Sequence, residues 1–375
     1  MTDRLVTDPV TGPGSADHAA RRLRARDLLR EQAPDADWLL VTSLANIRYL
    51  TGFSGSNAVF ALHASEPDRD LLGTDGRYAE QVASQSPGLQ TVIERATLNA
   101  IVSRLNGGPG SVFMESTVTL DAWQLACREF GSQPPVLDGL VEALRIIKDA
   151  AELAVLERAC RITAEAFDRL MDQIRPGLTE VYLARRLEQL FGELGAQDRA
   201  FPSIVAGGPN SAIPHHECGQ RPLQPGDLLV IDAGALVDGY HADMTRTVVV
   251  GRAPEPWQRE IHQVVAQAQA KARACAHPGV PLARLDAAAR EPIAQAGFAD
   301  AFVHGLGHGV GLAIHEAPMI GARATGSILA GTPITIEPGI YLNGRGGVRI
   351  EDTVVVESNG ARVLTQLPRD LVVVG

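Results

Sequence analysis

The chain has 375 residues, of which 45% are hydrophobic, and this length exceeds what one core usually organises, so two domains are expected. Its 44 acidic residues outnumber the 34 basic ones, giving a net charge of −10 without a long basic run, which excludes the electrostatic footprint of a nucleic-acid-binding protein. No apolar stretch approaches a membrane span, and the four cysteines lack metal-knuckle spacing. We therefore expect a cytoplasmic protein with reduced thiols and without nucleic-acid or membrane partners.

The first part of the chain predicts a flexible tail and then a small α/β domain. Residues 1–15 contain Asp, Pro, Gly and Thr without the apolar core of a signal peptide. Residues 16–146 alternate short apolar strands with helical patterns. The expected helices are Ala16–Glu31, Tyr78–Ala83, Thr97–Leu105 and Asp121–Phe130. The expected strands are Trp38–Thr42, Ala58–Leu62, Asp70–Leu72, Gln90–Ile93 and Ser111–Met114. Neither a helix nor a strand is predicted for residues 46–53, which lead into a turn-rich loop at 54–57.

Residues 147–375 are expected to form a second domain, because the composition changes and long amphipathic helices begin. The order of two helices followed by strands occurs twice here, without a matching sequence repeat. The expected helices are Ala150–Ile174, Thr179–Leu194, Pro256–Ala276 and Leu282–Ala296.

The stretch 228–250 predicts two buried strands joined by a turn. Leu228–Ile231 and Thr247–Val250 are apolar and partly β-branched, as buried strands are. The dipeptide Asp238-Gly239 between them favours a tight turn. This hairpin is expected to lie at the centre of the second domain.

Asp232 and Asp243 each place a carboxylate beside one of these apolar runs. Taken singly, such an Asp often ends a strand in a turn or is solvated, and this alternative stays open. Two carboxylates facing each other are costly, because unit charges ~4 Å apart at an effective dielectric near 20 repel by roughly 4 kcal/mol. A divalent cation between them is the simple way to make the pair favourable.

Three more ligand-type residues follow in similar settings. His308 stands in a run with four glycines, which lets backbone approach a ligand closely, although such a histidine is often only a loop residue. Glu337 ends an apolar strand, and Glu351 follows Arg349 by two residues, so both point to the same face of a strand. A simple ion pair between Arg349 and Glu351 is the alternative reading.

Together these residues form a set of carboxylates and one imidazole. Such a set suits Mn, Co, Fe or Zn and not a soft thiolate metal. Four negative charges match two divalent cations, and the small number of ligands predicts bridging carboxylates. The five candidate ligands are Asp232, Asp243, His308, Glu337 and Glu351.

The motifs that carry these residues resemble those of the pita-bread metallopeptidases, the family of methionine aminopeptidase, aminopeptidase P and prolidase. The similar motifs are Asp-x-Gly, Gly-Tyr-x-x-Asp-x-Thr-Arg-Thr, Gly-His-Gly-x-Gly, Ile-Glu-Pro-Gly and Arg-Ile-Glu-Asp. Residues 48–53 are similar to a motif of the creatinase-type domain of the proline-specific branch. The resemblance implies a creatinase-type α/β domain at 16–146, followed by an α+β pita-bread catalytic domain at 147–375.

The resemblance also implies how the ligands are shared. Asp232 resembles the bidentate ligand of one metal ion, whereas His308 and Glu337 resemble the ligands of the other. Asp243 and Glu351 resemble the carboxylates that bridge the two ions.

Further roles follow from the same resemblance. His215 is similar to a substrate-binding histidine that aids proton transfer, and His315 to the histidine that stabilises the tetrahedral intermediate. His304 resembles the proline-pocket histidine, and Arg349 an arginine that supports the site. Glu337 is expected to move the proton from the nucleophile to the leaving nitrogen.

The implied function is hydrolysis of Xaa-Pro peptide bonds by a metal-bridging hydroxide. A dipeptidase (prolidase) is favoured, with an Xaa-Pro aminopeptidase (aminopeptidase P) as the alternative. A creatinase-like hydrolase without metals and a non-catalytic binding protein are remote alternatives. The resemblance implies two divalent ions, most consistent with Mn, with Zn or Co as alternatives, and a homodimer through the amino-terminal domain. A dipeptidase also needs a cation or donor for the free carboxylate of its substrate, for which Arg48, the loop 53–57 or a partner subunit are candidates.

Overall fold

The computed structural model describes residues 16–106 and 111–375, so the predicted tail at 1–15 lies outside the described residues. The chain divides into two compact units. Among the described residues, the first comprises those up to Leu144 with Asp149–Ala154, and the second comprises Arg145–Lys148 with Val155–Gly375. In the described ranges, no helix is both long and apolar enough to cross a membrane.

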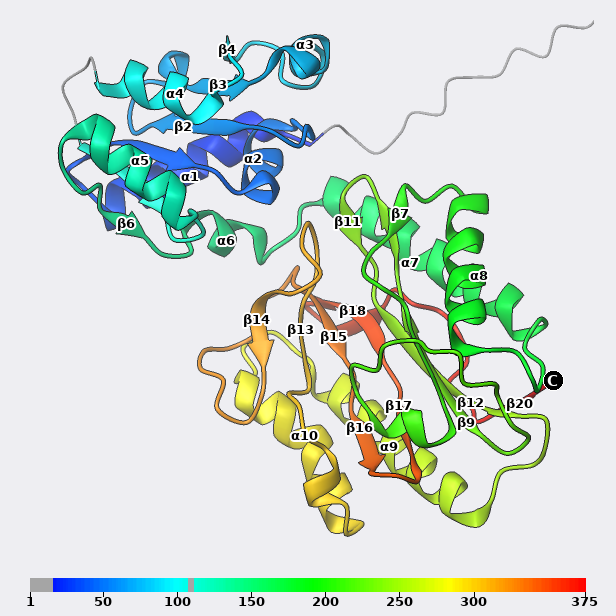
Figure 1. Ribbon diagram of the computed structural model, residues 1–375. Coiled ribbons are helices and arrows are strands. Elements are labelled where there is room, and N and C mark those ends of the chain that lie inside the picture. The colour runs from blue at the N-terminus through cyan, green and yellow to red at the C-terminus, as the bar shows by residue number, and fades with distance from the viewer. Residues whose placement is uncertain (1–15, 107–110) are drawn as a thin grey trace, which may run out of the picture. The chain divides into compact units, whose positions relative to one another are not determined.

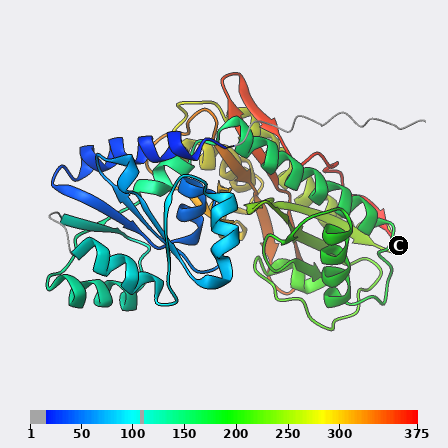
Figure 2. The same cartoon turned by 90° about the horizontal axis from the view of Figure 1, so that it is seen from above.

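The first unit is built on a mixed sheet with the strand order β4-β3-β2-β1-β5-β6. Helices α1 and α2 cover one face of this sheet, and α4 and α5 cover the other (Figures 1 and 2). The strands are β1 (Ala36–Val41), β2 (Val59–His63), β3 (Leu71–Thr74), β4 (Gln90–Ile93), β5 (Ser111–Glu115) and β6 (Val136–Leu137). The helices are α1 (His18–Gln32), α2 (Leu44–Thr51), α3 (Ala79–Gln85), α4 (Thr97–Asn106), α5 (Leu120–Phe130) and α6 (Leu140–Arg145). The predicted α/β class of this domain is confirmed.

Helix α2 is an element that the sequence pattern did not predict. Ser43 caps its start by accepting a hydrogen bond from the amide of Asn46, and Gly52, with φ of 80°, ends it. Its residues include β-branched and aromatic types of modest helix propensity. Burial of Ile47 and Leu50 stabilises the helix, and this packing is not visible in so short a pattern.

The second unit is an α+β domain, as predicted. Its sheets have the strand orders β20-β12-β9-β8, β14-β13-β15-β18-β19, β16-β17 and β11-β10-β7. The helices are α7 (Ala150–Met171), whose residues up to Ala154 count with the first unit, α8 (Glu180–Glu193), α9 (Pro256–Cys275) and α10 (Leu282–Gln295). The strands up to the hairpin are β7 (Asp198–Arg199), β8 (Ile204–Gly207), β9 (Leu228–Ala233), β10 (Ala235–Val237), β11 (Tyr240–His241) and β12 (Met244–Val250). The later strands are β13 (Gly307–Gly309), β14 (Glu316–Ile320), β15 (Pro333–Ile336), β16 (Gly339–Leu342), β17 (Gly346–Arg349), β18 (Asp352–Glu357), β19 (Gly360–Val363) and β20 (Val373–Val374).

The central hairpin pairs β9 with β12 in antiparallel fashion, which confirms the predicted pairing. The turn at Asp238 and Gly239 is also confirmed, and both residues have positive φ, of 44° and 74°, as a two-residue hairpin loop requires. The path between the long strands differs from the prediction, because β10 and β11 form their own short hairpin in a separate sheet with β7.

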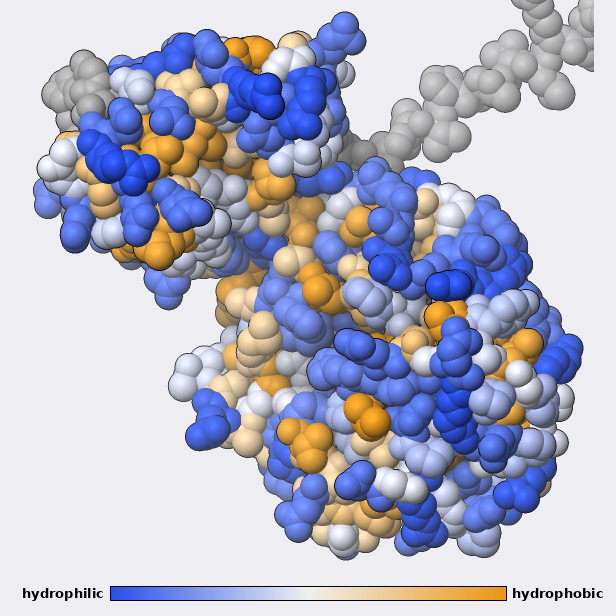
Figure 3. Space-filling model, in the orientation of Figure 1, coloured by the Kyte–Doolittle hydropathy of each residue, from blue (hydrophilic) through white to orange (hydrophobic). Residues whose placement is uncertain are grey.

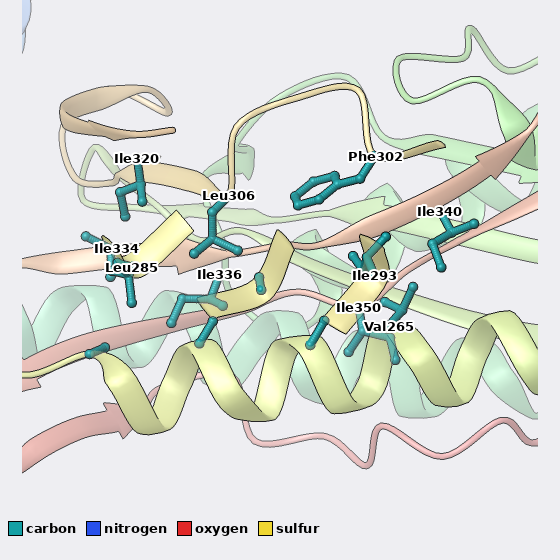
Figure 4. Close-up of a cluster of buried hydrophobic side chains, with 14 of the residues drawn as sticks. Val265, Leu285, Ile293, Phe302, Leu306, Ile320, Ile334, Ile336, Ile340 and Ile350 are labelled. Carbon is teal, nitrogen blue, oxygen red and sulfur yellow. The ribbon is translucent and has the colours of Figure 1, made fainter. Parts of the chain in front are cut away.

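Strand periodicity separates the core of the second unit from its polar face. Ile334 and Ile336 belong to the buried apolar cluster, which also contains side chains of α9 and α10 (Figure 4). Thr335 and Glu337 alternate with them, and the Thr335 hydroxyl donates to Glu337 at 3.3 Å on the opposite face. The same alternation puts Ile350 in the apolar cluster between two charged neighbours. The outer face drawn in Figure 3 is mostly hydrophilic, with scattered hydrophobic spots.

Candidate active site and metal centre

A single cavity of about 1280 Å³ in the second unit is lined by every site residue predicted from the sequence. Strand ends supply most of them: Asp232 lies in β9, Asp243 precedes β12, and Glu337 follows β15. The structure brings together Asp232, Asp243, His308, Glu337 and Glu351 with His215, His304, His315 and Arg349.

The tightest group contains Asp243, His308 and Glu351, whose ligand-type atoms lie within 4.8 Å of one another. His308 Nε2 lies 3.6 Å from Asp243 Oδ2 and 3.5 Å from Glu337 Oε1. Asp232 is opposite Thr245 in the β9–β12 ladder, so Asp243, two residues earlier, is its diagonal neighbour on the same face.

The orientation of His308 leaves a lone pair facing the carboxylates. Its Nδ1 lies 3.0 Å from the carbonyl oxygen of Gly309, which can only accept, so Nδ1 carries the proton. Burial lowers the pKa of His308 to about 4, and the imidazole is therefore neutral at pH 7. The unprotonated Nε2 therefore faces the carboxylate oxygens of Asp243 and Glu337, and all of these atoms are hydrogen-bond acceptors. A cation bound between them would remove the repulsion.

The carboxylates raise one another's pKa in the absence of a cation. Burial, followed by the charges of Glu351 and Asp232, raises the pKa of Asp243 well above its ordinary value. Burial and the charge of Glu337 do the same for Glu351. Removal from bulk water raises the pKa of Glu337 to about 8. The protein therefore pays an electrostatic penalty here unless protons or cations bind.

Arg349 neutralises only part of this charge. Its Nη2 donates to Asp232 Oδ2 at 2.6 Å, while Asp232 Oδ1 is buried without a hydrogen-bond partner among the described residues. Glu351 accepts instead from the hydroxyl of Thr245 at 2.7 Å, so the simple Arg349–Glu351 ion pair is not formed. Four carboxylates against one guanidinium leave a formal charge of −3, and with the unpaired Oδ1 and His308 Nε2 this donor set fits divalent cations.

A hydrogen-bonded chain runs from Arg349 to His304. Arg349 Nη1 donates to the hydroxyl of Tyr341 at 2.9 Å, and that hydroxyl lies 2.8 Å from His304 Nε2. The other nitrogen of His304 lies 2.8 Å from the carbonyl oxygen of Gly305, so both ring nitrogens have partners. Burial raises the pKa of Tyr341 to about 12, which keeps its hydroxyl protonated. Sequence reasoning missed Tyr341, although it lies on the strand that follows Glu337.

His215 and His315 are exposed residues that line the cavity. The ring of His315 packs edge-on against His308, with 4.4 Å between the ring centroids. His315 therefore lies beside His308, one of the predicted metal ligands.

Glu180 is a second residue that sequence reasoning missed. This fully buried carboxylate accepts at Oε1 from the amide of Gly207 and the side chain of Asn210, both at 2.8 Å. Its Oε2 lies 2.8 Å from His216 Nε2 and accepts from the amide of Gly219 at 3.1 Å. Burial alone would raise the pKa of Glu180, but these hydrogen bonds hold it below its ordinary value. Glu180 thus ties together the two ends of the segment that carries His215.

Glu316 anchors the neighbouring loop. It accepts hydrogen bonds from Arg145, from Lys148 Nζ at 2.9 Å, and from the amide of Ala313 at 2.8 Å. Since Glu316 directly follows His315, these contacts fix the backbone beside that imidazole.

Asp352 lies on the opposite side of its strand from Glu351. It is buried and accepts from Arg246 at 2.9 Å, Gln269 at 2.6 Å and Arg369 at 2.6 Å. These contacts give it a structural setting outside the cavity.

Comparison with known proteins gives this arrangement a family. Residues 21–147 match the model of the creatinase/prolidase N-terminal domain, and residues 154–358 match the model of metallopeptidase family M24. An Xaa-Pro dipeptidase from Pyrococcus furiosus is 45% identical over 235 residues, which are 63% of this chain and 67% of the relative.

Two solved structures extend the likeness over nearly the whole chain. An Xaa-Pro dipeptidase from Bacillus anthracis is 32% identical, covers 96% of this chain and 100% of its own, and superposes with a TM-score of 0.91. An X-Pro aminopeptidase from Thermotoga maritima is 34% identical, covers 90% of this chain and 98% of its own, and has a TM-score of 0.83. The predicted fold class and family resemblance are therefore confirmed, and the chain belongs to metallopeptidase family M24.

Proposed function

We propose that this metallopeptidase is an Xaa-Pro dipeptidase that hydrolyses dipeptides with proline in the second position. The observation that carries the proposal is the cluster of carboxylate side chains around the neutral His308, because this cluster needs cations and lines the cavity. The similarity to dipeptidases named for Xaa-Pro substrates supports the substrate class.

We assign the metal ligands as predicted, to Asp232, Asp243, His308, Glu337 and Glu351. Two bound divalent cations would supply Lewis-acid chemistry, lowering the pKa of a water molecule and polarising the scissile carbonyl. Manganese is our proposed native metal, with zinc or cobalt as alternatives that the same oxygen and nitrogen ligands accept.

The side chains in and around the ligand set transfer the proton and stabilise the negative charge that develops on the substrate. Glu337 takes the proton from the attacking water at a carboxylate oxygen and returns it to the leaving nitrogen. His315, beside His308, donates to the oxygen on which negative charge develops. His215 is exposed on the cavity lining, where it binds the substrate and helps transfer the proton. Arg349 fixes the orientation of the Asp232 carboxylate by donating a hydrogen bond to one of its oxygens.

The proline preference follows from the surroundings of His304. Its two ring nitrogens are engaged by Tyr341 and the Gly305 carbonyl, and its ring packs edge-on against Phe302 at 5.0 Å between centroids. The histidine therefore offers ring surface and no waiting acceptor. A proline nitrogen in a peptide bond has no N–H to donate, so such a surface suits the proline ring.

An Xaa-Pro aminopeptidase that acts on longer peptides is the second candidate. The cavity of about 1280 Å³ supports it, because this volume exceeds the ~300–1000 Å³ of usual small-molecule sites. The likeness to an X-Pro aminopeptidase supports it too.

The test compares hydrolysis of Ala-Pro, Ala-Pro-Ala and Ala-Ala by the manganese-loaded protein. We expect release of alanine from Ala-Pro with the highest kcat/KM. A clear preference for Ala-Pro-Ala would make the protein an aminopeptidase, and preference for Ala-Ala would refute proline specificity.

We also propose that the protein is cytoplasmic and forms a homodimer. In each chain, the amino-terminal domain spans residues 16–146 and the catalytic domain spans 147–375. The four unpaired cysteine thiols support a reducing compartment. The dimer rests on the family resemblance alone. Light scattering of the purified protein and cell fractionation test the two statements.

A further inference from the structure

Residues 302–306, which carry His304, belong to neither a helix nor a strand. They connect the short 3-10 turn Ala299–Ala301 to the start of β13. A backbone segment without ladder partners must find other donors and acceptors for its polar groups. Two side chains of α10, Arg290 and Asp286, supply such partners here, so the position of His304 depends on that helix.

Arg290 holds the carbonyl oxygens on both sides of Val303. Its Nη1 donates to the carbonyl oxygen of Phe302 at 2.9 Å, and its Nη2 donates to that of His304 at 2.8 Å. Its guanidinium carbon also lies 4.2 Å from the centre of the Phe302 ring, which is a cation–π contact. One side chain therefore fixes the backbone of the segment and also the ring against which His304 packs edge-on.

Asp286 fixes Arg290 in turn. It lies one helical turn earlier and accepts from Arg290 Nε at 2.8 Å and from Nη2 at 2.9 Å, which makes a two-point ion pair. The Asp286 carboxylate is only 1% exposed, and it also accepts from the amide of Leu306 at 3.1 Å. The ion pair therefore contacts the segment at Phe302, His304 and Leu306, which are alternate residues.

The far end of the segment is attached to the proposed metal centre. The carbonyl oxygen of Leu306 accepts from the amide of Glu337, a proposed ligand, at 2.9 Å. Gly305 packs so closely on the end of β14 that an added Cβ would lie 2.6 Å from the carbonyl oxygen of Ile320. His304 therefore has a defined position relative to Glu337, provided that the ion pair on α10 holds the rest of the segment.

The imidazole of His304 is neutral, and both of its nitrogens are engaged. Burial, followed by the charge of Arg349, lowers the pKa of His304 to about 4, and the charge of Arg290 adds to this effect. Because Nδ1 donates to the carbonyl oxygen of Gly305, Nε2 accepts from the hydroxyl of Tyr341. An uncharged ring whose polar atoms are already paired can lose contact with water at little cost, as packing against an apolar ring requires.

We propose that Arg290, held by Asp286, is a positioning residue that makes the enzyme select a proline ring in the second position of its substrate. This inference rests on the proposed function and deepens it, because it assumes that His304 contacts that ring. Arg290 lines the cavity but acts through the backbone of Phe302 and His304. Without its donors the segment relaxes, and the surface that His304 presents no longer matches the ring.

The experiment compares Ala-Pro with Ala-N-methylalanine in the wild type and in Arg290→Met, each loaded with manganese. Both substrates lack an N–H on the scissile nitrogen, and only Ala-Pro carries the ring. We expect the wild type to prefer Ala-Pro. In the variant, kcat/KM for Ala-Pro should fall by roughly tenfold to a hundredfold, the range for hydrogen bonds lost from a charged group. The value for Ala-N-methylalanine should change much less, so the preference for the ring should be lost.

The ratio of the two kcat/KM values separates positioning from loss of stability. This ratio does not depend on how much of the enzyme is folded, so a variant that is merely less stable keeps the wild-type ratio. If Ala-N-methylalanine is cleaved too slowly to measure, its inhibition of Ala-Pro hydrolysis gives the second affinity. Amide hydrogen exchange in residues 302–306 is a readout without substrate, and it should be faster in Arg290→Met.

Two further variants complete the comparison. Arg290→Lys should recover part of the preference for Ala-Pro, because it restores the charge and a donor without the planar fork. Arg284→Met is the matched control. Arg284 is exposed on the same helix, pairs with Glu291 at 2.9 Å and lies outside the cavity, so its removal should change neither the ratio nor the exchange.

A wild-type ratio in Arg290→Met would show that the inference is wrong while the dipeptidase function stands. Equal turnover of both substrates by the wild type would also overturn it, because no selection for the ring would then exist. If Arg290→Met does not fold, Arg290→Lys decides: a reduced ratio supports the inference, and an unchanged ratio refutes it. If the wild type cleaves neither substrate, the proposed function fails, and the role of Arg290 is refuted with it.

Discussion

Arg349 Nη2 lies 2.6 Å from Asp232 Oδ2, and these residues are 117 positions apart in the sequence. The protein thereby satisfies one oxygen of the Asp232 carboxylate and leaves the other, Oδ1, buried without a partner among the described residues. A buried oxygen without a partner costs about 1–3 kcal/mol, so the arrangement is reasonable only if something else binds there. Under the proposed function, the arginine orients the carboxylate and leaves its second oxygen available for a cation.

The substitution Arg349→Lys should preserve metal binding but impair catalysis. Lysine keeps one positive charge near Asp232 but lacks the fork that also reaches Tyr341 and Thr245. We expect kcat/KM for Ala-Pro to fall by about tenfold to a hundredfold, equivalent to roughly 1.4–2.7 kcal/mol. Steady-state kinetics with metal analysis measure both quantities. The control Arg345→Lys changes an exposed arginine that stacks on Trp257 and should have no effect; unchanged kinetics for Arg349→Lys would contradict the aiming role.

Asp243→Asn should remove metal binding and Xaa-Pro hydrolysis together. The substitution preserves shape but takes away a charge from the group that contains His308 and Glu351. Metal content per protein after dialysis and turnover of Ala-Pro are the measurements. Asp238→Asn is the matched control, because that Asp is exposed in the same hairpin and asparagine tolerates its φ of 44°. Full activity of Asp243→Asn would refute the assignment of Asp243 as a ligand.

Removal of metal should make stability fall as pH rises. The ordinary pKa of a glutamate is 4.5, whereas folding of the metal-free protein raises the pKa of Glu337 to about 8. Proton binding therefore favours the folded state below the lower value, and this stabilisation is lost as pH rises through the higher one. Asp243 and Glu351 shift in the same direction. We expect the Tm of the EDTA-treated protein to drop between about pH 5.5 and about pH 8.5.

Added manganese should restore Tm most strongly at the alkaline end. A ligand at ~100 times its Kd stabilises by about 2.7 kcal/mol, which corresponds to roughly 5–10 °C for a domain of this size class. Differential scanning calorimetry at both pH values, with and without the metal, makes the comparison. A Tm of the metal-free protein that rises with pH would show that these carboxylates do not repel one another in the folded state.

The setting of the candidate ligands on strands of the second unit was predictable because strand periodicity is local. Apolar residues alternate with Glu337 and Glu351, so the burial of Glu351 and the position of Glu337 at the end of an apolar strand could be read without knowledge of the fold. The hairpin turn at Asp238-Gly239 carries its own chemical signal and was predicted for the same reason.

The contacts of the site depend on residues far apart in the chain and could not be predicted in this way. Glu180 precedes its partner His216 by 36 positions, and Arg145 lies 171 positions before Glu316. The start of α8 at Thr179 was visible as an N-cap, but nothing in the local pattern says that Glu180 turns inward. An ion pair of Arg349 with Glu351 was the alternative that the sequence left open, whereas Arg349 donates to Asp232, 117 positions away.

Glu180→Ala should loosen the segment that carries His215. The change leaves the buried amide of Gly207 and the side chain of Asn210 without their acceptor, and the ring of His216 without its partner. Losing a buried carboxylate with several donors costs about 3–5 kcal/mol, so unfolding by urea should begin at lower concentration. We also expect faster amide hydrogen exchange in residues 207–219 and a higher KM for Ala-Pro.

Two further variants separate positioning from simple loss of stability. Glu180→Gln retains a carbonyl oxygen for the amide of Gly207. Compared with Glu180→Ala, it should therefore have a lower KM for Ala-Pro and slower amide hydrogen exchange in residues 207–219, both closer to the wild-type values. Glu188→Gln changes a carboxylate on the same helix that pairs with Arg199 near the surface, and it should alter neither exchange nor KM. If Glu180→Ala lowers stability but leaves exchange in 207–219 and KM unchanged, then Glu180 supports only the fold and does not position His215.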